Sequence, residues 1–431
     1  MSYIHPQSTE ATKSELDLFV IPPTQTSIES HTLCKIFPTS SLTSTNTIEF
    51  VIPGSEEFVD MNSLLVGVEL KVLKADGTNL DSTAAATGSP ANTFENIFPS
   101  QYFLHALFSQ VDILLGPTII TPATGTYPYR SFFDARLYTS QGAQSTFLRT
   151  SLWGERTARR DAIAGSKLVQ LLGPLHADIC QQKNLLLNHL PITIRLVRSS
   201  SAFALYRERT TTDVKVDLQT CYLYVTKYRL MPPVERGIHD ALQTANAKYF
   251  LTRTEVKSFN VPTGHQFYSQ EYVFTGQLPR KFIVGFVTSS AFTGNLDEHA
   301  FVFKHLDVNH IVAYVDNQMV PSYPYTPDFD KDLYAREYYS IFQELNFNHC
   351  DPRLNLSWAA YKELVAIYAF NLSPDRSDGA ECGALSLQKR GTVRIEVKFK
   401  AALTKAHNMI VYAHFDSLIQ ISADRTVMTD Y

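Results

Sequence analysis

The sequence predicts an all-β protein of two tandem antiparallel β-sandwiches, with a few helical insertions and an extended N-terminal arm. Three observations support this prediction. Strand-like runs dominate the chain, helix-like runs are few and irregularly placed, and four segments recur in the same order about 200 residues apart. Regular alternation of strands and helices would have indicated a parallel sheet instead. At 431 residues the chain is also too long for one ordinary domain.

The expected strands show period-two alternation or β-branched runs between turn signals. They lie at 47–54, 64–77, 111–122, 192–197, 214–230, 282–287, 393–399 and 409–421. The run 64–77 closes on Asp-Gly, and 111–122 turns around Gly116-Pro117, which predicts a hairpin. Small polar residues fill 75–93, where we expect an exposed loop.

Few stretches have helical character. The best candidates are 131–153 and 328–347, and a shorter one, 238–247, follows the strand-breaking pair Pro232-Pro233. Each lies between predicted strands, so these helices are read as insertions into β-sandwiches.

An internal repeat divides the chain into two similar units. The matched pairs are Tyr127–Tyr129 with Tyr323–Tyr325, the hairpin ending at Pro122 with that ending at Pro321, the run from Ile192 with that from Val393, and the segment at Pro53 with that at Pro262. Units of about 200 residues with roughly eight strands and long insertions are typical of the jelly roll. Immunoglobulin-like sandwiches are the rival, but their units have about 100 residues. We expect an arm over 1–30, a first jelly roll over 31–233 and a second over 234–431.

Composition favours a protein that buries surface against partners. Charged residues make up 19% and aromatic residues 12%, whereas soluble proteins typically have about 25% charged residues. This balance suits extensive interfaces or an all-β core. A net charge of −4 provides no sequence-wide attraction for nucleic acid or an anionic membrane, and the arm itself is acidic.

Cysteine usage and the N-terminus place the protein in a reducing compartment. The five cysteines (Cys34, Cys180, Cys221, Cys350 and Cys382) are widely spaced and form no CxxC pair, which indicates reduced thiols. The N-terminus has no apolar signal core, and no apolar run is long enough to span a membrane. We therefore expect a protein that is neither secreted nor inserted in a membrane.

Two groups of potential metal ligands are weak candidates. The alternation of Asp328, Asp330 and Asp332 resembles a calcium loop, but Leu333 stands where glycine is needed and Tyr339 where glutamate is needed. An acidic helix start is the better interpretation. The second group depends on a predicted strand.

His176, Asp178 and Cys180 would share one face of a strand. A metal site there needs further ligands, for which His349-Cys350 is the obvious source, and a packed strand is favoured. Common hydrolase, zinc-protease and nucleotide-binding motifs are absent from the sequence. No enzyme activity, cofactor or metal is expected.

The densest basic cluster is Arg156, Arg159 and Arg160. It could contact nucleic acid, or it could belong to an insertion loop whose charges pair among themselves. The second interpretation is favoured, and direct contact with nucleic acid stays an open question.

Several ordered segments resemble one protein family over nearly the whole chain. They are SELDLFVIPPTQTSIES from Ser14, VIPGSEEFVDM, LHALFSQVDILLGPTIITPATGTYPYR, AFNLSPDRSDG, GTVRIEVKFKAAL and the C-terminal VYAHFDSLIQISADRTVMTDY. They resemble the major capsid proteins of Polinton (Maverick) elements and related adintovirus-like and virophage-like viruses. The resemblance implies a double jelly roll that forms homotrimeric, pseudo-hexagonal capsomers. These capsomers tile an icosahedral shell enclosing DNA.

The resemblance also implies partners and a location. The partners would be further copies of the chain, first within the trimer and then between capsomers, together with a penton or minor capsid protein. The location would be the virion, assembled in the host cytoplasm or nucleus. The alternatives are that the chain is itself a minor capsid or penton subunit, or that it is a tandem β-sandwich carbohydrate-binding protein. The repeat disfavours the first, because such subunits are usually single jelly rolls. For the second, Trp153 and Trp358 make a poor sugar platform.

The arm is the candidate assembly segment. Leu16, Leu18, Phe19 and Val20 form an apolar run that stops at Pro22-Pro23. Such a segment can add a strand to the sheet edge of a neighbouring subunit, with pockets taking alternate side chains. It could equally cover an edge of its own first jelly roll, and both arrangements stay open at this stage.

Overall fold

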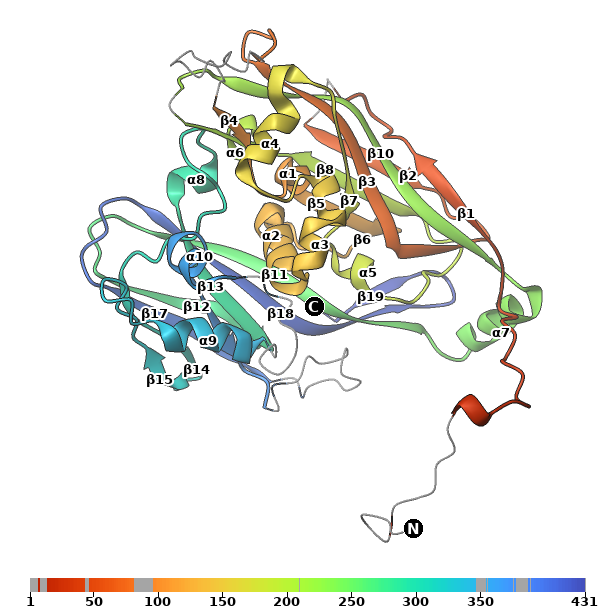
Figure 1. Cartoon of the computed structure of the whole chain (residues 1–431). Coiled ribbons are helices and arrows are strands. Elements are labelled where there is room, and N and C mark those ends of the chain that lie inside the picture. Colours follow the sequence, from red (N-terminus) through yellow and green to blue (C-terminus); the bar gives the residue numbers. More distant parts are fainter. Residues whose placement is uncertain are drawn as a thin grey trace.

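The computed structural model describes residues 14–42, 46–80, 96–208, 210–345, 356–374 and 389–430, together with positions 7, 354, 376 and 387. Residues 28–230 form a sandwich of two four-stranded antiparallel sheets (Figure 1). One sheet contains, in spatial order, β1 (Ile28–Ile36), β10 (Val214–Leu230), β3 (Phe58–Lys74) and β7 (Val169–Pro174). The other contains β2 (Thr47–Ile52), β8 (Ile192–Arg198), β5 (Phe108–Leu115) and β6 (Thr118–Ile119). A short pair, β4 (Ile97–Pro99) and β9 (Leu205–Arg207), stands apart.

Residues 247–429 form a second sandwich. Its first sheet contains β11 (Ala247–Val261), β18 (His407–Ile421), β13 (Lys281–Thr288) and β16 (Ile367–Asn371), with β19 (Val427–Thr429) paired to β18. Its second sheet contains β12 (Phe267–Gln277), β17 (Arg390–Phe399), β14 (Val308–Val315) and β15 (Gln318–Tyr325).

The two sandwiches have the same topology. If the eight principal strands of each are numbered in chain order, one sheet has the order 1-8-3-6 and the other 2-7-4-5 in both cases. This order, in which the chain passes repeatedly from one sheet to the other, is that of a jelly roll. The predicted fold of two antiparallel jelly rolls is confirmed. The predicted boundary between residues 233 and 234 falls inside helix α7 (Pro232–Leu242), between β10 and β11, and stays a prediction.

Local sequence explains the long strands. In β3, the alternate residues Val66, Val68, Leu70 and Val72 are all buried, as expected for a strand with one face on the core. On the other face Gly67 lies under the ring of Tyr222 from β10, and a Cβ at this position would come within 2.2 Å of that ring.

Ten short helices and three 3₁₀ turns occur in the described residues. The helices are α1 (Phe103–Ala106), α2 (Tyr127–Tyr138), α3 (Gln141–Ser145), α4 (Arg156–Ile163), α5 (Asp178–Gln181), α6 (Ser201–Ala204), α7, α8 (Ser289–Thr293), α9 (Ala335–Glu344) and α10 (Trp358–Glu363). The 3₁₀ turns are η1 (Ser14–Leu16), η2 (Phe147–Ser151) and η3 (Ala164–Ser166). None of the helices in the described part of the chain has the length and hydrophobicity needed to cross a membrane.

Both predicted long helices are shorter than expected. The stretch 131–153 is divided among α2, α3 and η2, because Thr139 is extended and Ser140 caps α3 by accepting a hydrogen bond from the Ala143 N–H. In 328–347 only α9 is helical, and the chain before it makes a turn in which Asp328 and Leu333 exchange backbone hydrogen bonds. Most of the predicted 75–93 loop lies outside the described residues.

The repeat is real, but two of its four matches are wrong in detail. The hairpins β5-β6 and β14-β15 are equivalent, and so are β8 and β17. Pro53, however, follows β2, the second strand of its sandwich, whereas Pro262 follows β11, the first strand. Tyr127–Tyr129 begins helix α2, whereas Tyr323–Tyr325 ends strand β15. The recurrence of prolines and tyrosines at these points therefore does not identify structurally equivalent positions in the two sandwiches.

Helix α2 joins the two sandwiches. It lies between them in Figure 1, and nearly all of its residues are buried. Phe132 stacks on Phe301 at a ring distance of 5.0 Å, and Phe133 packs against Phe303 and Tyr412. One apolar core therefore runs from the first sandwich through α2 to the second, whose interior holds a further core of its own.

Candidate functional site

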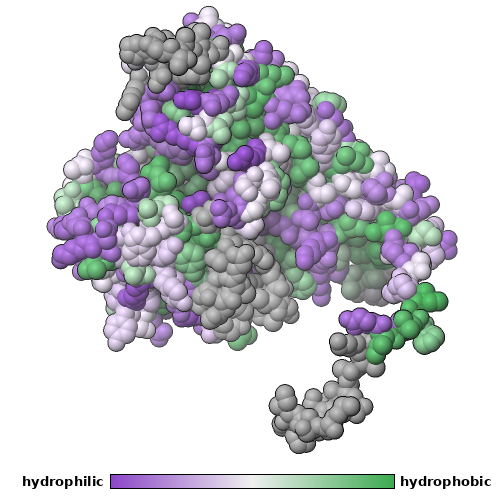
Figure 2. Space-filling model, in the orientation of Figure 1, coloured by the Kyte–Doolittle hydropathy of each residue, from purple (hydrophilic) through white to green (hydrophobic). Residues whose placement is uncertain are grey.

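The predicted assembly arm is exposed. Leu16, Leu18, Phe19 and Val20 protrude into solvent, Phe19 with 93% of its surface accessible. In Figure 1 the segment projects away from the sandwiches beyond α7, and Figure 2 shows its apolar side chains standing clear of the body. Docking of this segment on its own chain or on a neighbouring chain stays a prediction.

The arm leads into a strand with an open edge. Among the described strands, β1 pairs only with β10, so its outer backbone groups face away from the sheet. Most of its side chains are exposed, including Leu33, and Phe37 follows directly after it. An exposed edge with apolar side chains is a template for pairing with another segment.

Two further exposed edges lie on one sheet of the second sandwich. Strand β12 forms one edge of its sheet and exposes Phe267 and Tyr272. Strand β15 forms the opposite edge and exposes Met319 and Tyr323. The described surface thus carries apolar residues along sheet edges of both jelly rolls, where subunits can meet.

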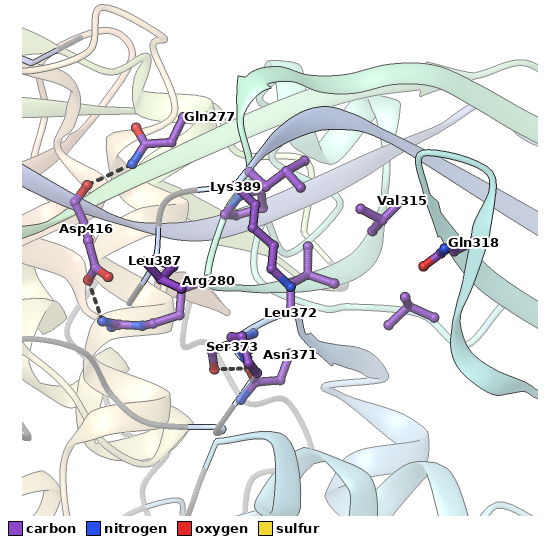
Figure 3. Close-up of a pocket in the computed structure, with 14 residues that line it drawn as sticks. Gln277, Arg280, Val315, Gln318, Asn371, Leu372, Ser373, Leu387, Lys389 and Asp416 are labelled. Carbon is purple, nitrogen blue, oxygen red and sulfur yellow. Dashed lines mark hydrogen bonds and ion pairs between the residues drawn. The ribbon is translucent and has the colours of Figure 1, made fainter. Parts of the chain in front are cut away.

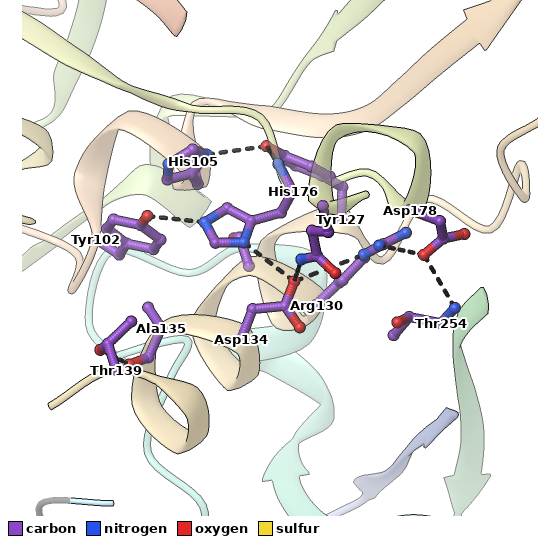
Figure 4. Close-up of polar contacts among 12 residues, drawn as sticks. Tyr102, His105, Tyr127, Arg130, Asp134, Ala135, Thr139, His176, Asp178 and Thr254 are labelled. Atoms are coloured by element: carbon purple, nitrogen blue, oxygen red, sulfur yellow. Dashed lines mark hydrogen bonds and ion pairs between the residues drawn. The ribbon is translucent and has the colours of Figure 1, made fainter. Parts of the chain in front are cut away.

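The most concentrated polar chemistry is buried between the sandwiches (Figure 4). Arg130 of α2 donates a 2.5 Å hydrogen bond to Asp178, which also accepts one from the Thr254 N–H of β11. Asp134, one turn further along α2, is 3.0 Å from His176 and accepts a 2.5 Å hydrogen bond from Tyr412 of β18. Asp178 and Asp134 therefore connect helix α2 to residues of both sandwiches.

Histidines and tyrosines extend this network. Tyr102 contacts His176 Nε2 at 2.8 Å, His105 contacts the Tyr127 hydroxyl at 2.9 Å, and His414 contacts the Tyr412 hydroxyl at 2.7 Å. Burial holds the pKa of His105 and that of His414 well below the usual value, so both imidazoles are neutral at pH 7.

The pKa values of the two carboxylates, Asp178 and Asp134, are shifted in opposite directions. Burial raises the pKa of Asp178, and the Arg130 charge only partly offsets this. Burial acts the same way on Asp134, but the hydrogen bond and charge of His176, the Arg130 charge and the Tyr412 hydroxyl outweigh it and lower its pKa. The adjoining cavity measures only about 20 Å³, room for about one water molecule. The network therefore connects the two sandwiches.

The predicted strand carrying His176, Asp178 and Cys180 is wrong. Asp178 and Cys180 lie in helix α5, because the carboxylate is drawn to Arg130 and Thr254 while Cys180 packs into the core. Burial raises the pKa of the Cys180 thiol to about 12. His349-Cys350, the expected source of further ligands, lies outside the described residues.

Each of the three alternating aspartates that resemble a calcium loop pairs with a different lysine. Asp328 pairs with Lys331, Asp330 with Lys400 and Asp332 with Lys362. Within the described ranges, no three His, Cys, Asp or Glu side chains lie together as a metal site would require. The described cysteines, Cys34, Cys180 and Cys221, are free.

The basic cluster forms helix α4 and not the expected loop. Arg156 pairs with Glu208, Arg159 is buried and donates to the Pro99 carbonyl, and Arg160 pairs with the adjacent Asp161. Arg156 and Arg159 thus bond to residues outside the cluster. The sequence did not reveal these partners. Trp153 is buried, and Trp358 stacks on Tyr334 at 4.3 Å.

A pocket of about 220 Å³ opens at one end of the second sandwich (Figure 3). Its wall includes Arg280, which donates to Asp416 at 2.7 Å, and Gln277, which donates to the Asp416 carbonyl at 2.8 Å. Sequence reasoning did not single out these residues, which come from separate strands and the loops between them. The ion pair balances its own charge, and Lys389 adds a further cation to the wall.

Together these features define the class of fold: two jelly rolls of identical strand order in one chain, joined by a buried helix, with open sheet edges and an exposed arm. This is a double jelly roll. No family model matches the chain. A chain in the Sputnik virophage structure has a TM-score of 0.63 at 12% identity, with 100% of this chain and 94% of that chain covered.

Two further solved structures share this fold, and one sequence relative is found. The mavirus major capsid protein has a TM-score of 0.57 at 12% identity, covering 100% of this chain and 97% of its own. The Faustovirus major capsid protein has a TM-score of 0.57 at 11% identity, covering 94% and 93%. An uncharacterised protein of Caenorhabditis elegans is 20% identical over 344 residues, or 77% of this chain and 81% of the relative. At these identities the structural likeness shows the fold.

Proposed function

We propose that this chain is a major capsid protein that self-associates into trimers and tiles an icosahedral shell enclosing DNA. The observation that carries the proposal is the identical topology of the two sandwiches, over a length that matches viral major capsid proteins almost end to end. Three chains with two similar jelly rolls each present six similar units around a threefold axis, so a trimer can occupy a six-coordinated position in a shell.

Interface burial is the proposed mechanism. Apolar residues lie along the open edges β1, β12 and β15, where contact with another subunit would remove them from water. Permanent assemblies of this kind bury more than about 2,000 Å². A trimer would be followed by contacts between capsomers and with a penton or minor capsid protein.

In this proposal the arm binds in trans. Leu16, Leu18, Phe19 and Val20 have no cover from the described part of their own chain, and Pro22-Pro23 sets an end to any added strand. Docked on a neighbouring sheet edge, the arm would gain backbone hydrogen bonds and bury the apolar run.

The proposal assigns no enzyme activity to the chain. The titratable network around Asp134 and Asp178 is enclosed and serves as a joint between the jelly rolls. We propose domain limits of 1–30 for the arm, 31–233 for the first jelly roll and 234–431 for the second. The site of action would be the virion, with assembly in the host cytoplasm or nucleus.

Light scattering during size exclusion, followed by negative-stain imaging, tests the proposal. We expect a particle of about 146 kDa, three times the chain mass of 48.6 kDa, with a pseudo-hexagonal outline. A stable monomer of 48.6 kDa that binds glycans would overturn the proposal in favour of a carbohydrate-binding protein.

A further inference from the structure

A cavity of about 420 Å³ lies where the two sandwiches meet, which is within the size range of small-molecule sites. The first jelly roll contributes Phe132 of α2, Trp153 and Tyr206 of β9 to its wall. The second contributes His299 and Phe301. The rings pack closely, with Tyr206 and His299 at 4.6 Å and Phe132 and Phe301 at 5.0 Å, so the walls are largely aromatic.

The cavity also carries an excess of positive charge. Arg136, Arg156 and Arg159 line it, whereas Glu208 is the one carboxylate among the described lining residues. Arg156 pairs with Glu208, and Arg159 donates to the Pro99 carbonyl. Two of the three guanidinium groups therefore face the cavity without a carboxylate partner.

Arg136 is the most unusual of these groups. It makes no ion pair or hydrogen bond with any described residue, and its Nε is buried without a partner. Burial lowers the pKa of Arg136, and no neighbouring charge offsets this. Arginine nevertheless stays protonated in proteins, so a positive charge remains at the cavity wall that none of the described residues neutralises. Buried charges are normally paired.

Arg159 and His299 also bear on the charge of the cavity. Arg159 is 5% exposed, and its Nε also lacks a partner among the described residues. Burial, with the charges of Arg159 and Arg156, lowers the pKa of His299 to about 3. The imidazole is therefore neutral at pH 7, and the positive potential of the cavity comes from the arginines.

We propose that this cavity binds a small organic anion with a flat apolar body and one carboxylate or phosphate head. The planar guanidinium of Arg136 can receive two oxygens of such a head, a geometry that suits both groups. The aromatic walls bury the body by stacking. Since the wall comes from both sandwiches, the bound anion stabilises the junction between them. The inference stands on the cavity alone and does not depend on the capsid function.

Titration calorimetry on the full-length protein tests this with three matched probes: 2-naphthoate, 2-naphthyl phosphate and the neutral 2-naphthamide. We expect one site per chain for at least one of the anions, with at least tenfold weaker binding of the amide. The anion that binds more tightly identifies the head group. Equal binding of the amide and both anions, or no binding of any probe, would overturn the proposal.

A charge-removing variant locates the site. Arg136→Gln should weaken anion binding at least tenfold, whereas Arg149→Gln, a nearby exposed arginine outside the cavity, should leave it unchanged. Because Arg136 has no partner to lose within the described part of the chain, the thermal midpoint of the variant should equal or exceed that of the wild type. Undiminished anion binding by Arg136→Gln would refute the assignment, and the comparison among probes on the wild type decides the case even if the variant fails to fold.

Discussion

The hydroxyl of Tyr412 donates a 2.5 Å hydrogen bond to Asp134, a residue 278 positions earlier in the chain. Tyr412 lies on a central strand of the second jelly roll, and Asp134 lies on the helix inserted from the first. Burial raises the pKa of Tyr412 well above its usual value, so the hydroxyl keeps its proton and remains a donor. This bond connects the two jelly rolls through a buried carboxylate.

Removing that hydroxyl should destabilise the protein. Tyr412→Phe leaves Asp134 and His414 each without one partner, and hydrogen bonds to buried charged groups contribute about 1.5–3 kcal/mol. We expect a loss of this size in the free energy of unfolding, measured by urea denaturation. Tyr323→Phe, at a tyrosine that is 79% exposed, should change it by less than about 0.5 kcal/mol. Equal effects of the two variants would contradict the role given to the Tyr412 hydroxyl.

Acid should destabilise the fold through buried histidines. Burial lowers the pKa of His105 and that of His414 in the folded state, so each takes up a proton in the unfolded chain before it does so in the folded one. Stability is therefore complete above about pH 6.5, the ordinary histidine pKa, and falls by about 1.4 kcal/mol per pH unit for each group below it. Urea midpoints at pH 7.5, 6.5 and 5.5 measure this.

His414→Gln should reduce the dependence of the unfolding free energy on pH by about 1.4 kcal/mol per pH unit, which is the contribution of one histidine. The charged neighbours of His414 are Lys281, Asp134, Arg280 and Arg130, and the carboxylate of Asp134 titrates only at much lower pH because its pKa is lowered. A slope unchanged by the substitution would mean that other groups cause the acid sensitivity.

Charging the arm should abolish assembly and leave the fold intact. Leu18→Asp with Phe19→Asp places two charges in the apolar run that we propose to dock on a neighbouring subunit, and burying an unpaired charge is costly. We expect a monomer with the wild-type thermal midpoint, measured by light scattering and calorimetry. Thr24→Asp, at an exposed position beyond Pro22-Pro23, is the matched control and should remain trimeric. A lowered midpoint of the monomer would instead mean that the arm docks on its own chain.

Gly67 should tolerate no side chain. A Cβ there would come within 2.2 Å of the Tyr222 ring, and such overpacking costs typically about 1–3 kcal/mol. Gly67→Ala should lower the free energy of unfolding by this amount in urea denaturation. Gly237→Ala, in helix α7 with no atom within 4 Å of its added Cβ, should raise it by about 0.5–1 kcal/mol because alanine is the better helix former. If both variants behaved alike, the contact between Gly67 and Tyr222 would carry no energetic weight.

Sequence patterns predicted strands such as β10 well because one face of the strand is buried and the other is more exposed. The run 214–230 is strand β10 from end to end, and the turn at Gly116-Pro117 joins β5 to β6 as expected. The pattern failed at 176–180, where alternating His176, Asp178 and Cys180 imitate a strand. There the attraction of Asp178 to Arg130 and Thr254 selects a helix, an example of tertiary contacts overriding local preference.

The sequence by itself determined that the chain forms two similar all-β units, preceded by an apolar arm with no evident place in either. Hydrophobic alternation and turn residues act over a few positions, so they can be read directly from the chain. Only the tertiary structure decided which charges are paired: it brought Asp134 to Tyr412, Asp178 to Thr254 and Arg156 to Glu208. It left Arg136 without a partner among the residues that the structure describes. Pairing depends on contacts between residues far apart in the chain, and those contacts exist only once the two jelly rolls have packed around α2.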